Sequence, residues 1–429
     1  MRKFLFFSVA LLTTTLLCLS CQKEEVVAQM DVATTKSENV QKGKTAHVSY
    51  KDAIQIATEA VAMLEGGATT RSGIKRRVDP SKIKYHVTPT TRSGEGGDTL
   101  YYVVNYADNA GFALVSTSRA EGDPLIAVTE QGNFTPGKET GNPGFDMYID
   151  LLNGRVDDGR TGIDPEFPGF GPFYEYTLMS ESEVEPMLRV RWGQWDPYNL
   201  YCDNPLYPAG CVAIALAQIM SFHEHPTSFT RTHDDSSVIQ SLNWTGIKFS
   251  PDANYCTVEN RQGIAHLIRE IGKRTIMDYT IEGSGTSEVR AIQCLPSFGY
   301  SSGASLQDYN LSRIQAELNN NRPVYMRGSY NYATVGHAWV VDGYYSRFEV
   351  LIEYYESGRG GDRTIISETP IHTNHLHINW GEHGYGNGFY NAGVFDTSDY
   401  VQLDAGVEAL PDSEFNTILQ IITGVIPNN

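Results

Sequence analysis

A cysteine at position 211 lies where a nucleophile could be activated. Pro208-Ala209-Gly210 predicts a turn, and the run from Val212 to Phe222 after it is apolar on nearly every side, which is typical of a helix buried in a core. Cys211 therefore falls at the N-terminus of that helix, where the dipole favours thiolate and should lower the pKa of the thiol. Free cysteines are also often buried as small apolar residues, so this stretch leaves a structural role open.

Three residues elsewhere supply what a thiolate nucleophile needs. His337 begins a strongly apolar segment and could act as a general base, although backbone groups can also satisfy a histidine at a strand end. Gly336, just before it, leaves room for an approaching substrate backbone. Asn379, on another predicted strand, could orient the base. Gln194 could donate its side-chain N–H to a developing oxyanion, with the Cys211 backbone N–H as a second donor. The parts required for acyl transfer thus occur in the order Gln, Cys, His, Asn.

The other histidines raise the alternative of a metal site. Four of them lie close together in the sequence: His372, His375, His377 and His383. No cysteine or carboxylate completes a recognised ligand spacing with them. We therefore expect neither a metal nor a cofactor.

The amino-acid composition limits the classes of protein to which the chain can belong. The chain has 429 residues, enough for two or three domains, and its 41% hydrophobic content indicates that most of it folds. The formal net charge is −18, with 51 acidic against 33 basic residues, which argues against a nucleic-acid partner because such partners need a basic surface.

The N-terminus predicts export. Arg2-Lys3 precedes an apolar run from Phe4 to Leu17, which is shorter than the roughly 20 residues that a membrane-spanning helix needs and is typical of a secretory signal. Cys18-Leu19-Ser20-Cys21 is similar to a bacterial lipobox, although a strict lipobox has an aliphatic residue in place of Cys18. We expect a signal peptide over 1–21, lipidation at Cys21, a linker over 22–45, and anchoring at the outer membrane or cell surface.

Hydrophobic periodicity divides the rest of the chain. A helix over 49–64 and strands over 100–106, 111–116 and 125–128 predict a small α+β unit within 46–152. Residues 153–172, dense in Gly, Pro and Asp, predict a cleavable linker. Within 173–429 the expected helices cover 183–189, 211–222, 258–272, 287–298 and 311–319. The expected strands follow at 323–327, 338–345, 349–355, 375–380 and 388–392. Helices before strands favour an α+β fold with segregated halves and an active site between them.

Four cysteines belong to the body of the chain: Cys202, Cys211, Cys256 and Cys294. An exported protein could pair them, and a Cys202–Cys256 or a Cys256–Cys294 bridge stays open because no spacing indicates a disulfide framework.

Four motifs together resemble the streptopain family of papain-like cysteine peptidases. They are Gln-x-x-Pro-Tyr-Asn at 194–199, Gly-Cys-Val-Ala-x-Ala-x-Ala-Gln-Ile-Met at 210–220, Gly-His-Ala-x-Val-Val-Asp-Gly at 336–343 and Asn-Trp-Gly at 379–381. The resemblance covers about 185–395, and residues 46–150 are similar to the inhibitory prodomain of the family.

The resemblance implies a zymogen with a two-lobed papain-like α+β catalytic domain, cleaving protein or peptide substrates and inhibited by its own prodomain. Cys211 would be the nucleophile, His337 the base and acid, and Gln194 an oxyanion donor. Asn379 would orient the imidazole, and Trp380 would shield that contact.

The family also has a Gly/Ser-rich loop near the substrate, which here corresponds to Ser284, Gly285 and Ser287. One position departs from the family pattern: Glu382 stands where relatives usually carry an aromatic residue, so we expect it to alter the shape of the cleft and subsite preference. Two alternatives remain: an acyltransferase using the same residues, and a surface binding lipoprotein or adhesin without turnover. The intact Gln–Cys–His–Asn set argues against the adhesin.

Overall fold

The computed structural model describes residues 44–45, 47–65, 84–87, 99–119, 123–157, 173–233, 236–329, 336–357, 362–395 and 418–428. The predicted signal peptide, Cys21 and the linker up to residue 43 lie outside the described residues. No helix within the described ranges is long and apolar enough to cross a membrane.

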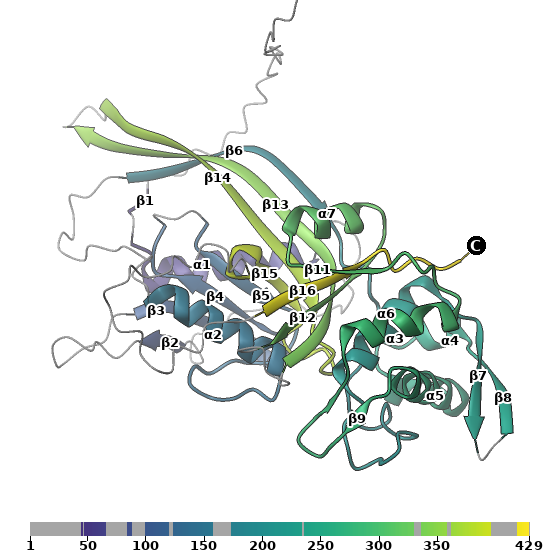
Figure 1. The fold of residues 1–429 in the computed structure, drawn as a ribbon. Coiled ribbons are helices and arrows are strands. Elements are labelled where there is room, and N and C mark those ends of the chain that lie inside the picture. Colours follow the sequence, from purple (N-terminus) through teal and green to yellow (C-terminus); the bar gives the residue numbers. More distant parts are fainter. Residues whose placement is uncertain are drawn as a thin grey trace, which may run out of the picture. The chain divides into compact units, whose positions relative to one another are not determined.

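A twelve-stranded antiparallel sheet runs through the described part of the chain (Figure 1). Its strands are β1 (Lys44–Thr45), β2 (Lys84–Val87), β3 (Thr99–Asn105), β4 (Phe112–Ser116), β5 (Leu125–Thr129), β6 (Phe173–Val184), β11 (Ser305–Asp308), β12 (Val324–Ser329), β13 (Gly336–Ser357), β14 (Asp362–Asn379), β15 (Gly388–Asn391) and β16 (Ile418–Thr423). The main order is β11-β16-β12-β13-β14-β15-β5-β4-β3-β2, and β6 pairs with β13 and β1. Because β5 pairs with β15, strands of the N-terminal unit continue the sheet of the C-terminal half.

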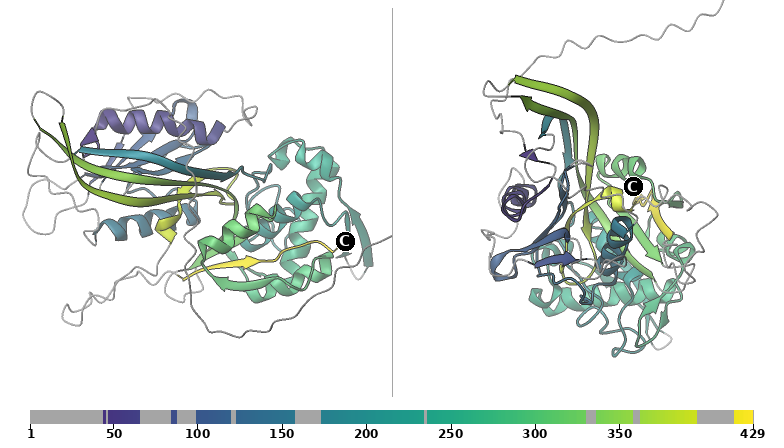
Figure 2. Two further views of the ribbon diagram at one scale, coloured as in Figure 1. Left: turned by 90° about the horizontal axis from the view of Figure 1, so that it is seen from above. Right: turned by 90° about the vertical axis from the view of Figure 1, so that its left-hand side faces the viewer.

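Two helices cover opposite faces of the N-terminal strands, α1 (Tyr50–Glu65) and α2 (Pro143–Asp157) (Figure 2). Side chains of β4 alternate between the faces, as the two-residue period of a strand requires. Ala113 and Val115 pack in the core beneath α1, whereas Leu114 packs in the core beneath α2. The same α2 core reaches into β13 and β14, so the N-terminal unit and the C-terminal sheet share a core.

The helical half is built around α3 (Cys211–His223), in which every residue from Val212 to Ser221 is buried. Its other helices are α4 (Trp244–Lys248), α5 (Val258–Arg274) and α6 (Glu288–Cys294), and two hairpins complete it, β7 (Ser228–His233) with β8 (Ser236–Ser241) and β9 (Asp278–Tyr279) with β10 (Ser284–Gly285). A further helix, α7 (Leu311–Asn319), packs on the sheet. Figure 1 shows α3 to α6 gathered beside the sheet, so the predicted α+β fold with segregated halves is confirmed.

One predicted helix is wrong, and so is the separation of two predicted strands. Residues 183–189 are not a helix: β6 ends at Val184, and the chain continues extended because the Met187 and Leu188 amides donate to the Asp342 carbonyl and carboxylate at 3.0 and 2.7 Å. The strands expected over 338–345 and 349–355 are one continuous strand, β13.

The sequence reasoning missed α2. Asn142 caps its first turn, since the Phe145 amide donates to Asn142 Oδ1 at 3.0 Å, and Pro143 occupies a first-turn position that needs no N–H donor. Because α2 continues to Asp157, the predicted linker over 153–172 begins too early, and its remainder from 158 lies outside the described residues. The four body cysteines are free, so neither candidate disulfide forms in this structure.

Candidate active site

Cys211 begins α3 directly after a tight turn at Gly210, whose φ is +93°. A Cβ at Gly210 would lie 2.8 Å from the Met277 sulfur and 3.1 Å from the Ser284 carbonyl oxygen, so only glycine fits there. The amide of Ala209 donates to the Gln194 carbonyl at 2.8 Å. This turn therefore brings the loop of Gln194 and strand β10 beside the cysteine.

The thiol of Cys211 is neutral in this structure. Although the residue is only partly buried, its sulfur is desolvated, and this raises the pKa of the thiol to about 11. Backbone amides of Ala338, Val212 and Cys211 itself oppose the shift, whereas the charge of Glu382 adds to it. The expectation of a lowered pKa is therefore wrong for this form, because desolvation outweighs the helix terminus.

His337 lies at the start of β13 and is hydrogen-bonded to a group other than the partner expected for it. Its Nε2 is 2.8 Å from the Trp380 carbonyl oxygen, and because a carbonyl only accepts, this nitrogen carries the proton. Asn379 instead donates from Nδ2 to the Val190 carbonyl at 2.8 Å and accepts from the Gly381 amide at 3.2 Å. The predicted Asn379–His337 contact is absent from the hydrogen bonds of the described residues. Burial lowers the pKa of His337 to about 4, so the imidazole is neutral.

The first turn of α2 holds His337 in this position. A Cβ at Gly144 would lie 2.7 Å from His337 Cδ2 and 2.4 Å from Trp380 Cε3, so the α2 backbone contacts both rings directly. Trp380 is fixed in turn, since its Nε1 donates to the Gly386 carbonyl at 3.1 Å. A neutral thiol and a neutral imidazole turned to the Trp380 carbonyl cannot form the ion pair that nucleophilic cysteines use.

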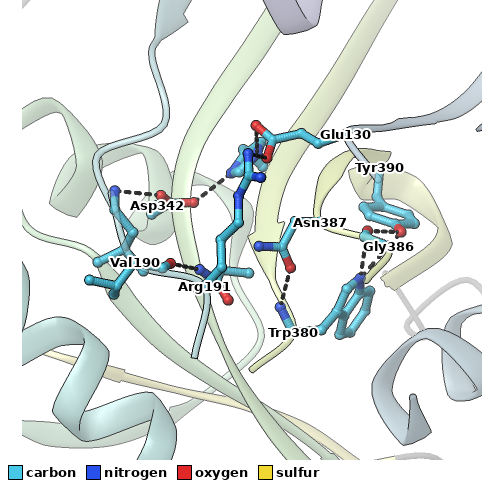
Figure 3. Close-up of polar contacts among 11 residues, drawn as sticks. Glu130, Val190, Arg191, Asp342, Trp380, Gly386, Asn387 and Tyr390 are labelled. Atoms are coloured by element: carbon cyan, nitrogen blue, oxygen red, sulfur yellow. Dashed lines mark hydrogen bonds and ion pairs between the residues drawn. The ribbon is translucent and has the colours of Figure 1, made fainter. Parts of the chain in front are cut away.

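A second contact anchors the N-terminal unit through charge (Figure 3). Glu130, directly after β5, accepts from Arg191 at 2.8 Å, and its other oxygen lies 3.7 Å from His377 Nε2. His377 Nδ1 lies 2.6 Å from Asp342 Oδ1. Burial acts to lower the pKa of His377, but the carboxylates of Asp342 and Glu130 outweigh it and raise this pKa to about 9. At neutral pH the Arg191 guanidinium and the protonated His377 imidazole therefore both attract the Glu130 carboxylate.

Backbone hydrogen bonds surround this charged contact. The Glu130 amide donates to the Asn387 carbonyl at 2.6 Å, and the Gly386 amide donates to the Gln131 carbonyl at 3.2 Å. Sequence reasoning missed the role of Glu130, because its partners lie about 60 and 250 residues away and no local pattern connects them. In the described part of the chain no group of three His, Cys, Asp or Glu could hold a metal.

Two of the three loop residues expected near the substrate lie close to the nucleophile's turn. Ser284 is buried with its carbonyl against Gly210, and a Cβ at Gly285 would meet open space. Ser287 has another role in this structure, since its hydroxyl caps α6 by accepting from the Arg290 amide at 3.4 Å.

The remaining candidate residues also have partners within the chain. A Cβ at Gly336 would lie 2.6 Å from the Gly328 carbonyl oxygen, so β12 occupies the space that we expected a substrate to use. Gln194 Nε2 donates to Glu382 Oε1 at 2.7 Å. The structure thus connects Glu382 with both Gln194 and Cys211, while His337 is bound to the Trp380 carbonyl.

Two family models match the two parts of the chain that meet at this site. Residues 192–390 match the model of the peptidase C10 family, and residues 45–156 match the model of the Spi protease inhibitor. The region from 192 to 390 is therefore similar to peptidase C10 catalytic domains. The streptopain of Streptococcus pyogenes is 23% identical over 379 residues, which cover 79% of this chain and 84% of that protein. A prointerpain A fragment of Prevotella intermedia shares the fold, with a TM-score of 0.52 and 21% identity over 81% of this chain and 100% of the fragment.

The two matched models identify the protein as a cysteine endopeptidase with an inhibitory prodomain. The papain-like α+β fold is confirmed, and protein substrates and inhibition by the protein's own prodomain follow from the two matched models. Gly144 and Glu130 lie within the inhibitor match, so their contacts are contacts of the prodomain with the catalytic part.

Proposed function

We propose that the protein is an exported, lipid-anchored zymogen that hydrolyses peptide bonds with Cys211 as nucleophile and His337 as general base and acid. One observation carries the assignment. Cys211 begins a buried helix with the backbone of Ala338, which follows His337, beside its sulfur, while the prodomain residue Gly144 presses on the imidazole. These positions support a thiolate–imidazolium pair of Cys211 and His337 that the prodomain prevents from forming.

The reaction follows once the prodomain has left. His337, no longer held by Gly144, takes the thiol proton, and the thiolate of Cys211 attacks the carbonyl carbon of the substrate. The carbonyl π electrons move to oxygen, where the Cys211 backbone N–H and Gln194 Nε2 stabilise the oxyanion. The imidazolium protonates the leaving amine as the C–N bond breaks, and water activated by His337 then hydrolyses the thioester. Asn379 would orient the ring, and Trp380 would exclude water from that contact.

Export and anchoring rest on the N-terminal motif. A lipid on Cys21 would hold the zymogen at the outer membrane or cell surface. We propose 46–152 as the inhibitory part, 173–429 as the catalytic part, and a cut in the segment 158–172 between α2 and β6. Such a cut ends the covalent link between the catalytic part and its inhibitor, and the same cut ends its link to the lipid. Cleavage of one bond would therefore begin both activation and release from the membrane.

Limited trypsin digestion of the lipidated full chain tests the proposal. We expect hydrolysis of a denatured protein to rise by about tenfold or more, because the cut ends a tether worth roughly millimolar effective concentration. The catalytic fragment should move from the membrane fraction to the supernatant, and iodoacetamide should abolish the activity. Full activity of the uncut chain would contradict latency, and activity that survives alkylation would contradict a cysteine nucleophile. Recovery of the uncut chain in the supernatant, before any digestion, would contradict the lipid anchor.

Gly144→Ala should weaken latency without any cut. The added methyl group would lie 2.4–2.7 Å from the rings of Trp380 and His337, so either α2 or the rings must move. Since alanine favours a helix by about 0.5–1 kcal/mol over glycine, loss of helix propensity cannot explain a loss of inhibition. We expect several-fold faster initial hydrolysis by the uncut chain, and a larger effect with Gly144→Val. Lys138→Ala, at an exposed position in the loop before α2, is the control. Unchanged latency in both Gly144 variants would show that this contact does not inhibit.

A further inference from the structure

Glu382 sits on a loop that packing holds firmly in place. Gly381, with a φ of +74°, lies against α3, since a Cβ there would be 3.2 Å from Ile214. The His383 amide donates to the Trp192 carbonyl at 3.1 Å, and a Cβ at Gly193 would lie 2.3 Å from the His383 ring. The loop is therefore wedged between the nucleophile's helix and the segment that leads to Gln194. This leaves the half-buried Glu382 carboxyl little freedom to swing into water.

The carboxyl group of Glu382 occupies the donor that the oxyanion would use. Its Oε1 accepts from Gln194 Nε2 at 2.7 Å. Its charge also raises the pKa of the Cys211 thiol, so the carboxylate acts electrostatically on the nucleophile. The partner of Glu382 is a neutral amide rather than a cation. A negative charge in this position repels an oxyanion that must form beside it.

We propose that Glu382 gates the oxyanion hole: when ionised it takes the Gln194 hydrogen bond from the substrate, and when protonated it donates its own hydrogen bond to the oxyanion. This inference rests on the proposed peptidase mechanism and adds a residue to it. In the attack step the thiolate sulfur bonds to carbon and the π electrons move to oxygen. The Glu382 O–H and Gln194 Nε2 then donate to that oxygen, and the proton stays on Glu382 when the C–N bond breaks.

The proton on Glu382 is available near neutral pH. Burial raises the pKa of this carboxyl to about 7, and the Gln194 hydrogen bond only partly opposes the shift. Because the folded pKa lies above the ordinary value, the group is protonated in mildly acidic solution and ionises as the pH rises through about 7. The Cys211 thiol, at the start of α3, interacts electrostatically with this carboxylate. On its own loop His383 has a lowered pKa, caused by burial and partly opposed by the Asp252 charge.

Two further ionisable groups near this loop are engaged elsewhere. The side chain of Arg191 passes over Gly384, but its guanidinium pairs with Glu130 at 2.8 Å. The imidazole of His337 is neutral and bound to the Trp380 carbonyl. Neither group therefore neutralises the Glu382 carboxylate in the zymogen.

The test compares Glu382→Gln with the wild type after trypsin cleavage of the full chain. The amide of glutamine can accept from Gln194 and donate to the oxyanion at every pH, like a permanently protonated Glu382. We expect kcat/KM of the wild type to fall as the pH rises from 6 to 8, and the variant to lose this fall. At pH 8 the variant should be about tenfold faster, a fraction of the roughly 10²–10³ that one oxyanion donor contributes. Glu259→Gln, at an exposed position of α5, should keep the wild-type profile.

A second measurement does not depend on turnover. In the uncut chain, Glu382→Gln removes a charge that raises the pKa of the Cys211 thiol, so iodoacetamide should label Cys211 several-fold faster at pH 8, with the labelled residue identified by mass spectrometry. If the cut wild type hydrolyses protein but shares its pH profile with Glu382→Gln, the gate is refuted and the peptidase mechanism stands. If the cut wild type hydrolyses nothing while alkylation responds as expected, the proposed peptidase function fails.

Discussion

Cys211→Ala will remove peptide hydrolysis, with kcat/KM falling by about 10⁴-fold or more even after trypsin cleavage, because no other group in this site can form the thioester. The turn at Gly210 and the buried helix α3 do not depend on the sulfur, so the variant should fold. If the peptidase cuts its own linker, the variant should also accumulate as the uncut chain. The measurement is hydrolysis of a denatured protein per folded molecule.

Cys256→Ser is the matched control for Cys211→Ala. Cys256 is also half-buried, and its thiol lies 3.6 Å from the Ile247 carbonyl, a contact that a serine hydroxyl can make. Its turnover should stay close to that of the wild type. Equal activity of Cys211→Ala and wild type would overturn the mechanism as a whole.

His337→Ala should be nearly as damaging as Cys211→Ala, because a nucleophile and its base act as a unit and their losses do not add. The double variant should therefore be no slower than either single variant. The pH dependence of activity and of Cys211 alkylation in the cut enzyme separates this role from a structural one. In the wild type both rates should change as the imidazole of His337 titrates, and His337→Ala should lack this change.

Asn379→Ala provides the graded comparison for His337→Ala. If Asn379 only orients the imidazole after the prodomain has left, its removal should cost less in kcat/KM than removal of the base itself. Because Asn379 also donates to the Val190 carbonyl, activities are compared per folded molecule. A fully active His337→Ala enzyme would require another base. His377 is a poor candidate in the zymogen, where Asp342 and Glu130 hold both of its ring nitrogens.

Local patterns in the sequence were enough to predict much of the fold. The helix after Cys211 is apolar on all sides, and β3 to β5 show strand-like runs bounded by turn residues, so both were found from short windows. The helix α2 was missed because the glycines at 137, 141 and 144 and the Gly/Pro/Asp-rich stretch from 153 favoured a loop, while its contacts come from β13 and from residues 392–395, far along the chain. The length of β13 was missed because pairing with β6 and β14, not local pattern, continues the strand through Ser346 and Arg347.

The identities of the proposed site residues could be read from motifs, but their electrostatic state could not. The motifs predict roles for Gln194, Cys211 and His337, and these roles remain predictions. The direction of the Cys211 pKa and the orientation of His337 depend on desolvation and on Gly144, which lies almost 200 residues before the histidine. No spacing rule connects such distant residues.

The continuity of the sheet across β5 and β15 has a consequence for when the enzyme works. After a cut between α2 and β6, the inhibitor is a separate chain that still pairs through this ladder and through Glu130 with Arg191. Its effective concentration falls from roughly millimolar to that of the solution, a difference of about 8 kcal/mol at nanomolar enzyme. At high local concentration the cut inhibitor would thus rebind and slow catalysis, and dilution would complete the activation that the cut begins.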